Sequence, residues 1–170
     1  GGYDIVFLCS PNNPTGGELS EQCLLEIVTR CKRLGILPVI DMSFADFSEN
    51  TVSANVLAEA GAAVIKAFTK IYAMPALRLG YMLCCDEELL GKVSLAGQSW
   101  SVNSLAQAAG AAALDDSDFI GRTVEYISRE RRFLTEKFGA MGIKTYPAAA
   151  NFILLKSEHD LADIAMESGI

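Results

Sequence analysis

Short, uninterrupted apolar runs alternate with amphipathic segments along the first half of the chain. The runs cover residues 5–9, 36–40 and 63–65, and continuous apolar runs of this length are typical of parallel strands covered on both faces. Between the first two runs, apolar residues recur at helical spacing from residue 24 to residue 34. This alternation predicts an α/β fold with a mostly parallel sheet and helices on both faces.

The next apolar run, residues 79–84, follows the third one too closely for a crossover helix. We therefore expect this strand to run antiparallel to the others. Helical segments are predicted over residues 55–60, from Asp86 through Val93, from about residue 101 in an alanine-rich stretch, and from Asp118 to Gly139.

The pattern changes after residue 140. Residues 143–146 and 151–155 predict two short strands, and Ser157 with Asp160 predicts a capped helix that ends at Gly169. Two strands and one helix bury too little apolar surface to fold alone. We therefore predict that residues 1–140 belong to a main α/β domain and that residues 141–170 begin a small α+β domain, which the chain contains only in part.

Composition and net charge argue against several kinds of partner and cellular location. A chain of 170 residues can bury a core, and a net charge of -7 argues against nucleic acid or an anionic membrane surface as a partner. No apolar run is long enough to span a membrane, and the first residues lack a signal-peptide layout. Five cysteines without a C-x-x-C pair predict reduced thiols and a cytoplasmic location. The single histidine, His159, offers neither a catalytic triad nor a metal site.

Polar residues follow three of the predicted strands. Residues 10–17 (SPNNPTGG) form a fixed loop, Asp41 ends the second strand, Lys70 follows the third, and Arg78 lies on the return of the same loop. Ligands bind at this edge of open α/β sheets. A partly desolvated lysine can form a Schiff base, and an arginine fork can hold a phosphate. A solvated Lys–Arg turn and a turn-capping aspartate are the alternative interpretation.

Three segments in this order resemble the pyridoxal-phosphate-dependent class I/II aminotransferases of fold type I. They read SPNNPTGG, VIDMSFADF and FTKIYAMPALRLGY, and the later segments WSVNSLAQAAG and NFILL extend the resemblance over nearly the whole chain. Within the family the similarity is greatest to histidinol-phosphate aminotransferases and threonine-phosphate decarboxylases. The resemblance implies part of the large cofactor-binding domain of this fold, the start of the small domain, and a homodimer.

The resemblance also implies a role for each matching residue. Lys70 would form the Schiff base with pyridoxal 5'-phosphate and later move the Cα proton of the substrate. Asp41 would pair with the pyridinium nitrogen, and Asn13 would donate a hydrogen bond to the 3-oxygen of the ring. Arg78, together with Thr69, would hold the cofactor phosphate.

Some residues depart from the family pattern. Phe44, at a cofactor-binding position, stands where tyrosine is common, although some decarboxylase-like members also have phenylalanine. Ala67 and Ala76 stand where a hydroxyl residue and a glycine are usual, which bears on cofactor affinity more than on cofactor identity. The glycine-rich phosphate loop and the ring-stacking aromatic of the family would lie before Gly1, and the carboxylate-binding arginine beyond Ile170. We expect the chain alone to bind the cofactor weakly and to be inactive.

The resemblance leads to one main interpretation and two alternatives. The main one is an aminotransferase that moves an amino group between a small phosphorylated amino substrate, of the histidinol-phosphate type, and a 2-oxo acid. The first alternative is a threonine-phosphate decarboxylase of cobalamin biosynthesis on the same scaffold. The second is a non-catalytic, aminotransferase-like sensor, against which the acidic balance of the chain counts.

Overall fold

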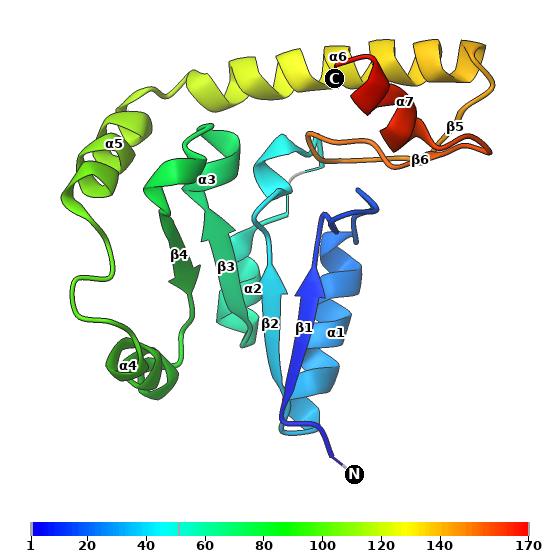
Figure 1. Cartoon of the computed structure of the whole chain (residues 1–170). Helices are drawn as coiled ribbons and strands as arrows, with labels where there is room; N and C mark the ends of the chain where they lie inside the picture. The colour runs from blue at the N-terminus through cyan, green and yellow to red at the C-terminus, as the bar shows by residue number, and fades with distance from the viewer. Residues whose placement is uncertain (1, 51, 170) are drawn as a thin grey trace.

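The computed structural model describes residues 2–50 and 52–169 of the chain. Four strands form one sheet in the order β1-β2-β3-β4, and two short strands form a separate pair (Figure 1). The strands of the main sheet are β1 (Ile5–Cys9), β2 (Leu37–Asp41), β3 (Ala63–Ala67) and β4 (Gly80–Leu83), and the separate pair is β5 (Lys144–Thr145) with β6 (Leu155–Lys156).

Most of the helices begin after a residue whose side chain accepts a hydrogen bond from a free N–H group of the first turn. Ser20, Ser53, Asp86 and Asn103 each accept a hydrogen bond from the backbone N–H three residues further on. The helices are α1 (Glu21–Arg33), α2 (Ala54–Ala60), α3 (Phe68–Ile71), α4 (Glu87–Ala96), α5 (Ser104–Asp115), α6 (Phe119–Ala140) and α7 (Leu161–Glu167), with short 3-10 turns η1 (Ala45–Phe47) and η2 (Pro75–Leu77).

The sheet is mostly parallel, as the pattern of apolar runs predicts. Strands β1, β2 and β3 run parallel, with Phe7 opposite Val39 and Val39 opposite Ala63. Strand β4 runs antiparallel to β3, because the segment between them is too short to cross the sheet. The α/β fold class and the direction of all four strands are therefore confirmed.

Helices α1 and α2 cover one face of this sheet (Figure 1). Leu24 and Val28 of α1, Leu57 of α2, and the strand residues Ile40 and Val64 are fully buried in one apolar cluster. Side chains alternate between the two faces of a strand, so the neighbouring positions point the other way. This second face carries the exposed residues Ile5, Phe7 (72% exposed) and Ile65, and the strand register places Asp41 on it as well.

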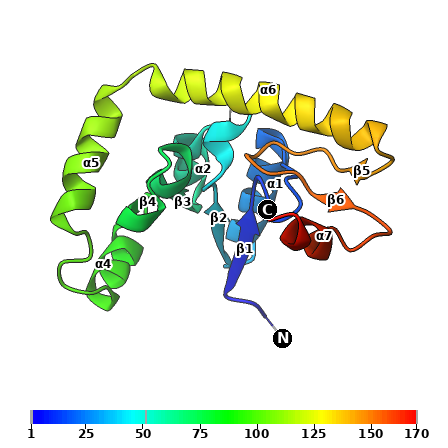
Figure 2. The ribbon, with the colours of Figure 1, turned by 45° about the horizontal axis from the view of Figure 1, so that its top comes forward.

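The last part of the chain folds back over the carboxyl edge of the sheet. Helix α6 spans the molecule, and the segment with β5, β6 and α7 returns beside β1 (Figure 2).

The two strands β5 and β6 are shorter than predicted. The helix prediction was wrong at its start, because Asp160 rather than Ser157 caps α7. A carboxylate is the stronger acceptor at the positive end of a helix. The domain boundary after residue 140 stays a prediction.

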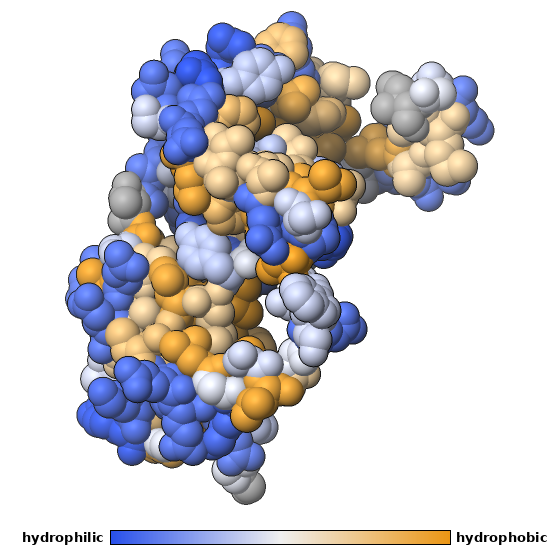
Figure 3. Space-filling model, turned by 90° about the vertical axis from the view of Figure 1, so that its left-hand side faces the viewer, coloured by the Kyte–Doolittle hydropathy of each residue, from blue (hydrophilic) through white to orange (hydrophobic). Residues whose placement is uncertain are grey.

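The side of the molecule formed by α4, α5 and β4 has apolar surface (Figure 3). The large exposed apolar side chains of β4, α4, α5 and the segment between the two helices are Tyr81, Leu90, Val93, Leu95, Trp100, Leu105 and Leu114. None of the helices in residues 2–50 and 52–169 is long and apolar enough to cross a membrane.

The buried cluster predicts a strong effect of truncating Ile40. Ile40→Ala should lower the free energy of unfolding by about 2–5 kcal/mol, because the side chain is fully buried between α1 and the sheet. Leu95→Ala, at a position that is 89% exposed, should change it by less than about 0.5 kcal/mol. Urea titration of both variants beside the wild type measures the difference. Equal losses would contradict the position of the core.

Candidate functional site

The loop after β1 is closed by its own backbone. The N–H of Asn12 donates to the carbonyl of Gly17 (2.8 Å), and the N–H of Gly16 donates to the carbonyl of Asn12 (2.6 Å). Ser10, which is buried, joins the loop to its neighbours: its N–H donates to the carbonyl of Asp41 (3.0 Å). Asn13 is exposed in this closed loop, at the carboxyl edge of the sheet.

Asp41 is the last residue of β2, and one of its carboxylate oxygens already accepts hydrogen bonds from the protein. Its Oδ1 accepts hydrogen bonds from the N–H of Ser43 (2.9 Å) and from the Ser43 hydroxyl (2.5 Å). Within the part of the chain that the structure describes, Oδ2 has no hydrogen-bond donor. The half-buried carboxylate is thus oriented by its own turn and keeps one oxygen available for a ligand.

Lys70 lies in a short helix rather than at the end of a strand. Helix α3 starts directly after β3, and Lys70 is exposed on it. Its Nζ lies 5.4 Å from the centroid of the Phe44 ring, within the range of a cation–π contact. Phe44 is itself buried, and its ring meets that of Phe152 edge-on with centroids 5.1 Å apart. The fold therefore brings together two of the predicted site residues, Lys70 and Phe44.

A second lysine nearby, Lys66, differs from Lys70 because it is paired with a carboxylate. Lys66, in β3, forms an ion pair with Asp46 of η1 at 2.5 Å, and its side chain is only 12% exposed. Lys70, by contrast, has no carboxylate within 4 Å among the residues described. An ammonium group held by a carboxylate is a poor nucleophile, so Lys70 is the better candidate for covalent chemistry. Sequence analysis missed the Lys66–Asp46 pair, although a lone lysine in the apolar strand AVIKA was a usable signal.

Arg78 and Thr69 belong to one closed loop with Lys70. The N–H of Phe68 donates to the carbonyl of Leu79 (3.1 Å), which joins the two ends of this loop. Arg78 has a left-handed backbone (φ 57°), and its Nη1 donates to the carbonyl of Pro75 (3.0 Å). Its exposed guanidinium retains further donors. Thr69, the residue before Lys70 on α3, is buried.

The segment before β6 completes the site from the far end of the chain. The N–H of Ala149 donates to the carbonyl of Gly16 (2.8 Å), and Phe152 of the same segment packs on Phe44. The segment therefore contacts both the loop after β1 and the loop after β2. The sequence motif NFILL marked this stretch, but its contacts with the two loops were not predicted.

The chemistry of these side chains fits pyridoxal 5'-phosphate. An amine without an acidic partner (Lys70) suits an aldehyde, and a carboxylate with a free oxygen (Asp41) suits a protonated ring nitrogen. The guanidinium of Arg78 suits a phosphate, and the amide of Asn13 can donate to a ring oxygen. Asp41 ends β2, Asn13 and Lys70 follow β1 and β3, and Arg78 precedes the antiparallel β4, so all four groups lie at the same edge of the sheet.

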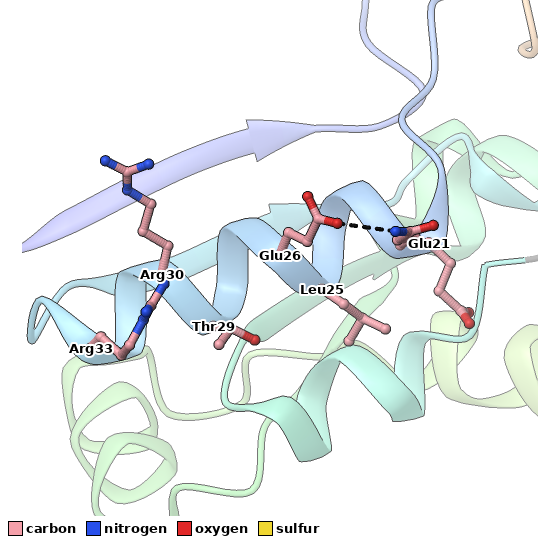
Figure 4. A pocket seen from close by; sticks show the side chains of 7 residues that line it. Glu21, Leu25, Glu26, Thr29, Arg30 and Arg33 are labelled. Atoms are coloured by element: carbon pink, nitrogen blue, oxygen red, sulfur yellow. Dashed lines mark hydrogen bonds between the residues drawn. The ribbon is translucent and has the colours of Figure 1, made fainter.

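A hollow of the surface also lies away from these residues. It is a shallow groove of about 580 Å³ along the outer side of α1, and the side chains in it are mostly long and polar (Figure 4). Gln22 and Glu26 are hydrogen-bonded to each other there (3.1 Å). The groove includes none of the predicted site residues, so it does not mark the reactive site. It is lined by Glu21, Gln22, Leu25, Glu26, Thr29, Arg30 and Arg33.

Comparison with known proteins decides the family. A family model described as "Aminotransferase class I and II" matches residues 2–166. The chain belongs to the class I and II aminotransferases. It is 37% identical over 165 residues to the threonine-phosphate decarboxylase of Salmonella typhimurium, a match that covers 95% of this chain and 45% of the relative. It is 33% identical over 153 residues to the histidinol-phosphate aminotransferase of Clostridium kluyveri, covering 89% of this chain and 42% of the relative.

Solved structures of the family share the fold described above. The histidinol-phosphate aminotransferase from Clostridium acetobutylicum superposes with a TM-score of 0.90 at 26% identity, over 98% of this chain and 53% of that one. The enzyme from Sinorhizobium meliloti, solved in complex with pyridoxal-5'-phosphate, gives a TM-score of 0.83 at 20% identity, over 96% of this chain and 46% of that one. The chain thus spans about half the length of the relatives it matches.

The close approach of Gly16 to the distal segment predicts that Gly16→Ala is destabilising. An added Cβ would lie 2.5 Å from the Cβ of Ala148, and the backbone of Gly16 is left-handed (φ +73°). Strain of this kind costs about 1–3 kcal/mol of unfolding free energy. Gly17→Ala is the matched control, since its nearest neighbour would be 3.7 Å away. Chemical denaturation distinguishes the two, and equal stabilities would disprove the contact.

Proposed function

We propose that the whole protein is a pyridoxal-phosphate-dependent enzyme that acts on a small amino substrate carrying a phosphate. The family match and the cofactor complex of the Sinorhizobium meliloti enzyme indicate the cofactor. The observation that carries the proposal is the state of Lys70. Its amine is exposed beside Phe44 and free of acidic partners among the described residues, at the sheet edge where Asp41 and Asn13 also lie.

Each proposed role uses a property of the side chain. Lys70 would bind the cofactor aldehyde covalently and then carry a proton to and from the substrate Cα. Asp41, oriented by Ser43, would keep the ring nitrogen protonated, and the ring so charged supplies an electron sink. Asn13 would donate to the ring oxygen. Arg78 and Thr69 would hold the cofactor phosphate through charge and hydroxyl donors.

Transamination and decarboxylation are both candidate reactions. An aminotransferase would pass the amino group to a 2-oxo acid, and the histidinol-phosphate aminotransferases among the relatives support this reaction. The higher identity to the Salmonella typhimurium threonine-phosphate decarboxylase supports the second. Phe44 favours the second as well, since some decarboxylase-like members of the family have phenylalanine at this position. The two reactions differ in which bond at Cα is aligned for cleavage, and this depends on contacts to the substrate carboxylate.

A homodimer is the proposed assembly, as is typical of the family. The surface of α4 and α5 offers a contact region, because Leu95, Trp100 and Leu105 are largely exposed there (Figure 3). Apolar surface of this kind is stabilised when a partner excludes water from it.

The state of Lys70 predicts the site of covalent attachment. Borohydride reduction of the full-length, cofactor-loaded protein, followed by peptide mapping, should place the pyridoxyl group on Lys70. Lys70→Ala should abolish it. Lys92→Ala is the matched control, since Lys92 is an exposed lysine paired with Glu88, and this variant should keep the adduct. An adduct on Lys66 or Lys92 would refute the assignment.

The proposed substrate class predicts the products. Histidinol phosphate with 2-oxoglutarate should yield glutamate if the protein is an aminotransferase. Threonine phosphate should release carbon dioxide without forming a keto acid if it is a decarboxylase. In either case the absorbance of the bound cofactor should change on mixing, and the unphosphorylated analogues serve as controls. Failure of both phosphorylated compounds to change the spectrum would exclude this substrate class.

A further inference from the structure

We propose that Lys66 and Asp46 form a positioning pair, which fixes the end of β3, just before the loop that carries Lys70, against the turn η1 that follows Asp41. Asp46 follows Asp41 by five residues, and Lys66 precedes Lys70 by four. Each partner of the ion pair thus lies four or five residues along the chain from a predicted site residue. The inference rests on the proposed function, because it assigns the pair a task in the same reaction.

The pair connects the end of β3 to η1, beyond the last backbone hydrogen bond between β2 and β3. The backbone ladder between β2 and β3 ends at the hydrogen bond from the N–H of Met42 to the carbonyl of Ile65 (2.8 Å). After it, Phe44 and Ile71 join the loops through apolar contact, which has no preferred direction. The Lys66 Nζ–Asp46 Oδ1 contact, at 2.5 Å, is directional and therefore fixes relative position.

The pair lines a small cavity of about 180 Å³. Phe68, Tyr72 and Tyr81 line it together with residues of α5 and α6. Burial raises the pKa of both tyrosine hydroxyls, and the negative charge of Asp46 raises them further. The phenols therefore stay neutral, and Lys66 and Asp46 are the charged groups of this cavity within the described residues.

The energetics argue for positioning rather than for stability. The side chains are 12% and 26% exposed, so both charges lose much of their hydration when the pair forms. This loss offsets most of the attraction, and replacing such a pair by neutral groups is often without cost to stability. Removing one partner alone is different, because it leaves the other charge partly buried and unpaired. A neutral double variant can thus test geometry with little change in stability.

The test compares two double variants of the full-length protein. Lys66→Met with Asp46→Asn removes the pair. The matched control, Lys92→Met with Glu88→Gln, removes an exposed pair on α4 whose side chains are 69% and 78% exposed. The first variant should lower kcat by about 10- to 100-fold with a smaller change in KM, because a displacement near 1 Å costs that much. It should also slow covalent attachment of the cofactor to Lys70 in the cofactor-free protein by about tenfold. The control should change neither rate, and both variants should keep a Tm close to that of the wild type.

The single variants distinguish a positioning effect of the ion pair from an effect of its charges. Lys66→Met leaves an unpaired carboxylate, which would raise the pH midpoint of the cofactor absorbance, whereas Asp46→Asn leaves an unpaired ammonium, which would lower it. A pure charge effect therefore has opposite signs in the two variants and vanishes in the double one. A positioning effect lowers kcat in all three variants.

Conservative variants test the contact itself. Lys66→Arg, which keeps the pair, should retain most activity. Asp46→Glu, which keeps the charge but moves the contact, should not, and it serves as the test if the double variant does not fold.

The outcomes distinguish this inference from the proposed function. If wild-type protein forms no adduct at Lys70, the proposed function and the positioning role are both overturned. If the wild type is loaded and active but the double variant has kcat and attachment rate within twofold of it, only the positioning role is overturned.

Discussion

The burial of Ile40 and Val64 against α1 and α2 determines the rest of the structure. Because side chains alternate along a strand, fixing one face of β2 and β3 to these helices also fixes what the other face carries. A shift of the strand register by one residue would expose the core side chains and would move Asp41 from the opposite face into the core. The parallel direction then places the end of every strand from β1 to β3 at the same edge. The candidate site is a consequence of this packing.

Much of this arrangement could be predicted from the sequence, because its causes are local. The apolar runs at β1 and β2 are continuous, Ser20 and Asp86 stand just ahead of helical patterns, and the short segment before β4 excludes a crossover. The three polar loops were recognisable from their residues and order. Their likeness to one family supplied the chemical roles, which residue spacing alone could not have given.

The remainder depends on contacts between distant parts of the chain. Nothing in the sequence around Lys70 required a helix there, and α3 owes its place to the apolar cluster of Ile71 with Phe44 and Ala150. Strand predictions near the end of the chain were too long, since only two residues on each side pair in β5 and β6. The Lys66–Asp46 contact was missed for the same reason. The lysine in the apolar strand AVIKA indicated a partly buried charge, but its partner lies twenty residues away and only the fold brings the two together.

The link between Gly16 and Ala149 has a consequence for the order of folding. It joins residues from opposite ends of the chain, so forming it closes a very long loop, and the entropy cost of closure increases with loop length. The unit of β1, α1 and β2, in contrast, is held by contacts between elements that follow one another directly in the chain, so its loops are much shorter. We therefore expect the sheet and its first helices to assemble early, and the loops near Lys70 at the carboxyl edge of the sheet to become ordered late.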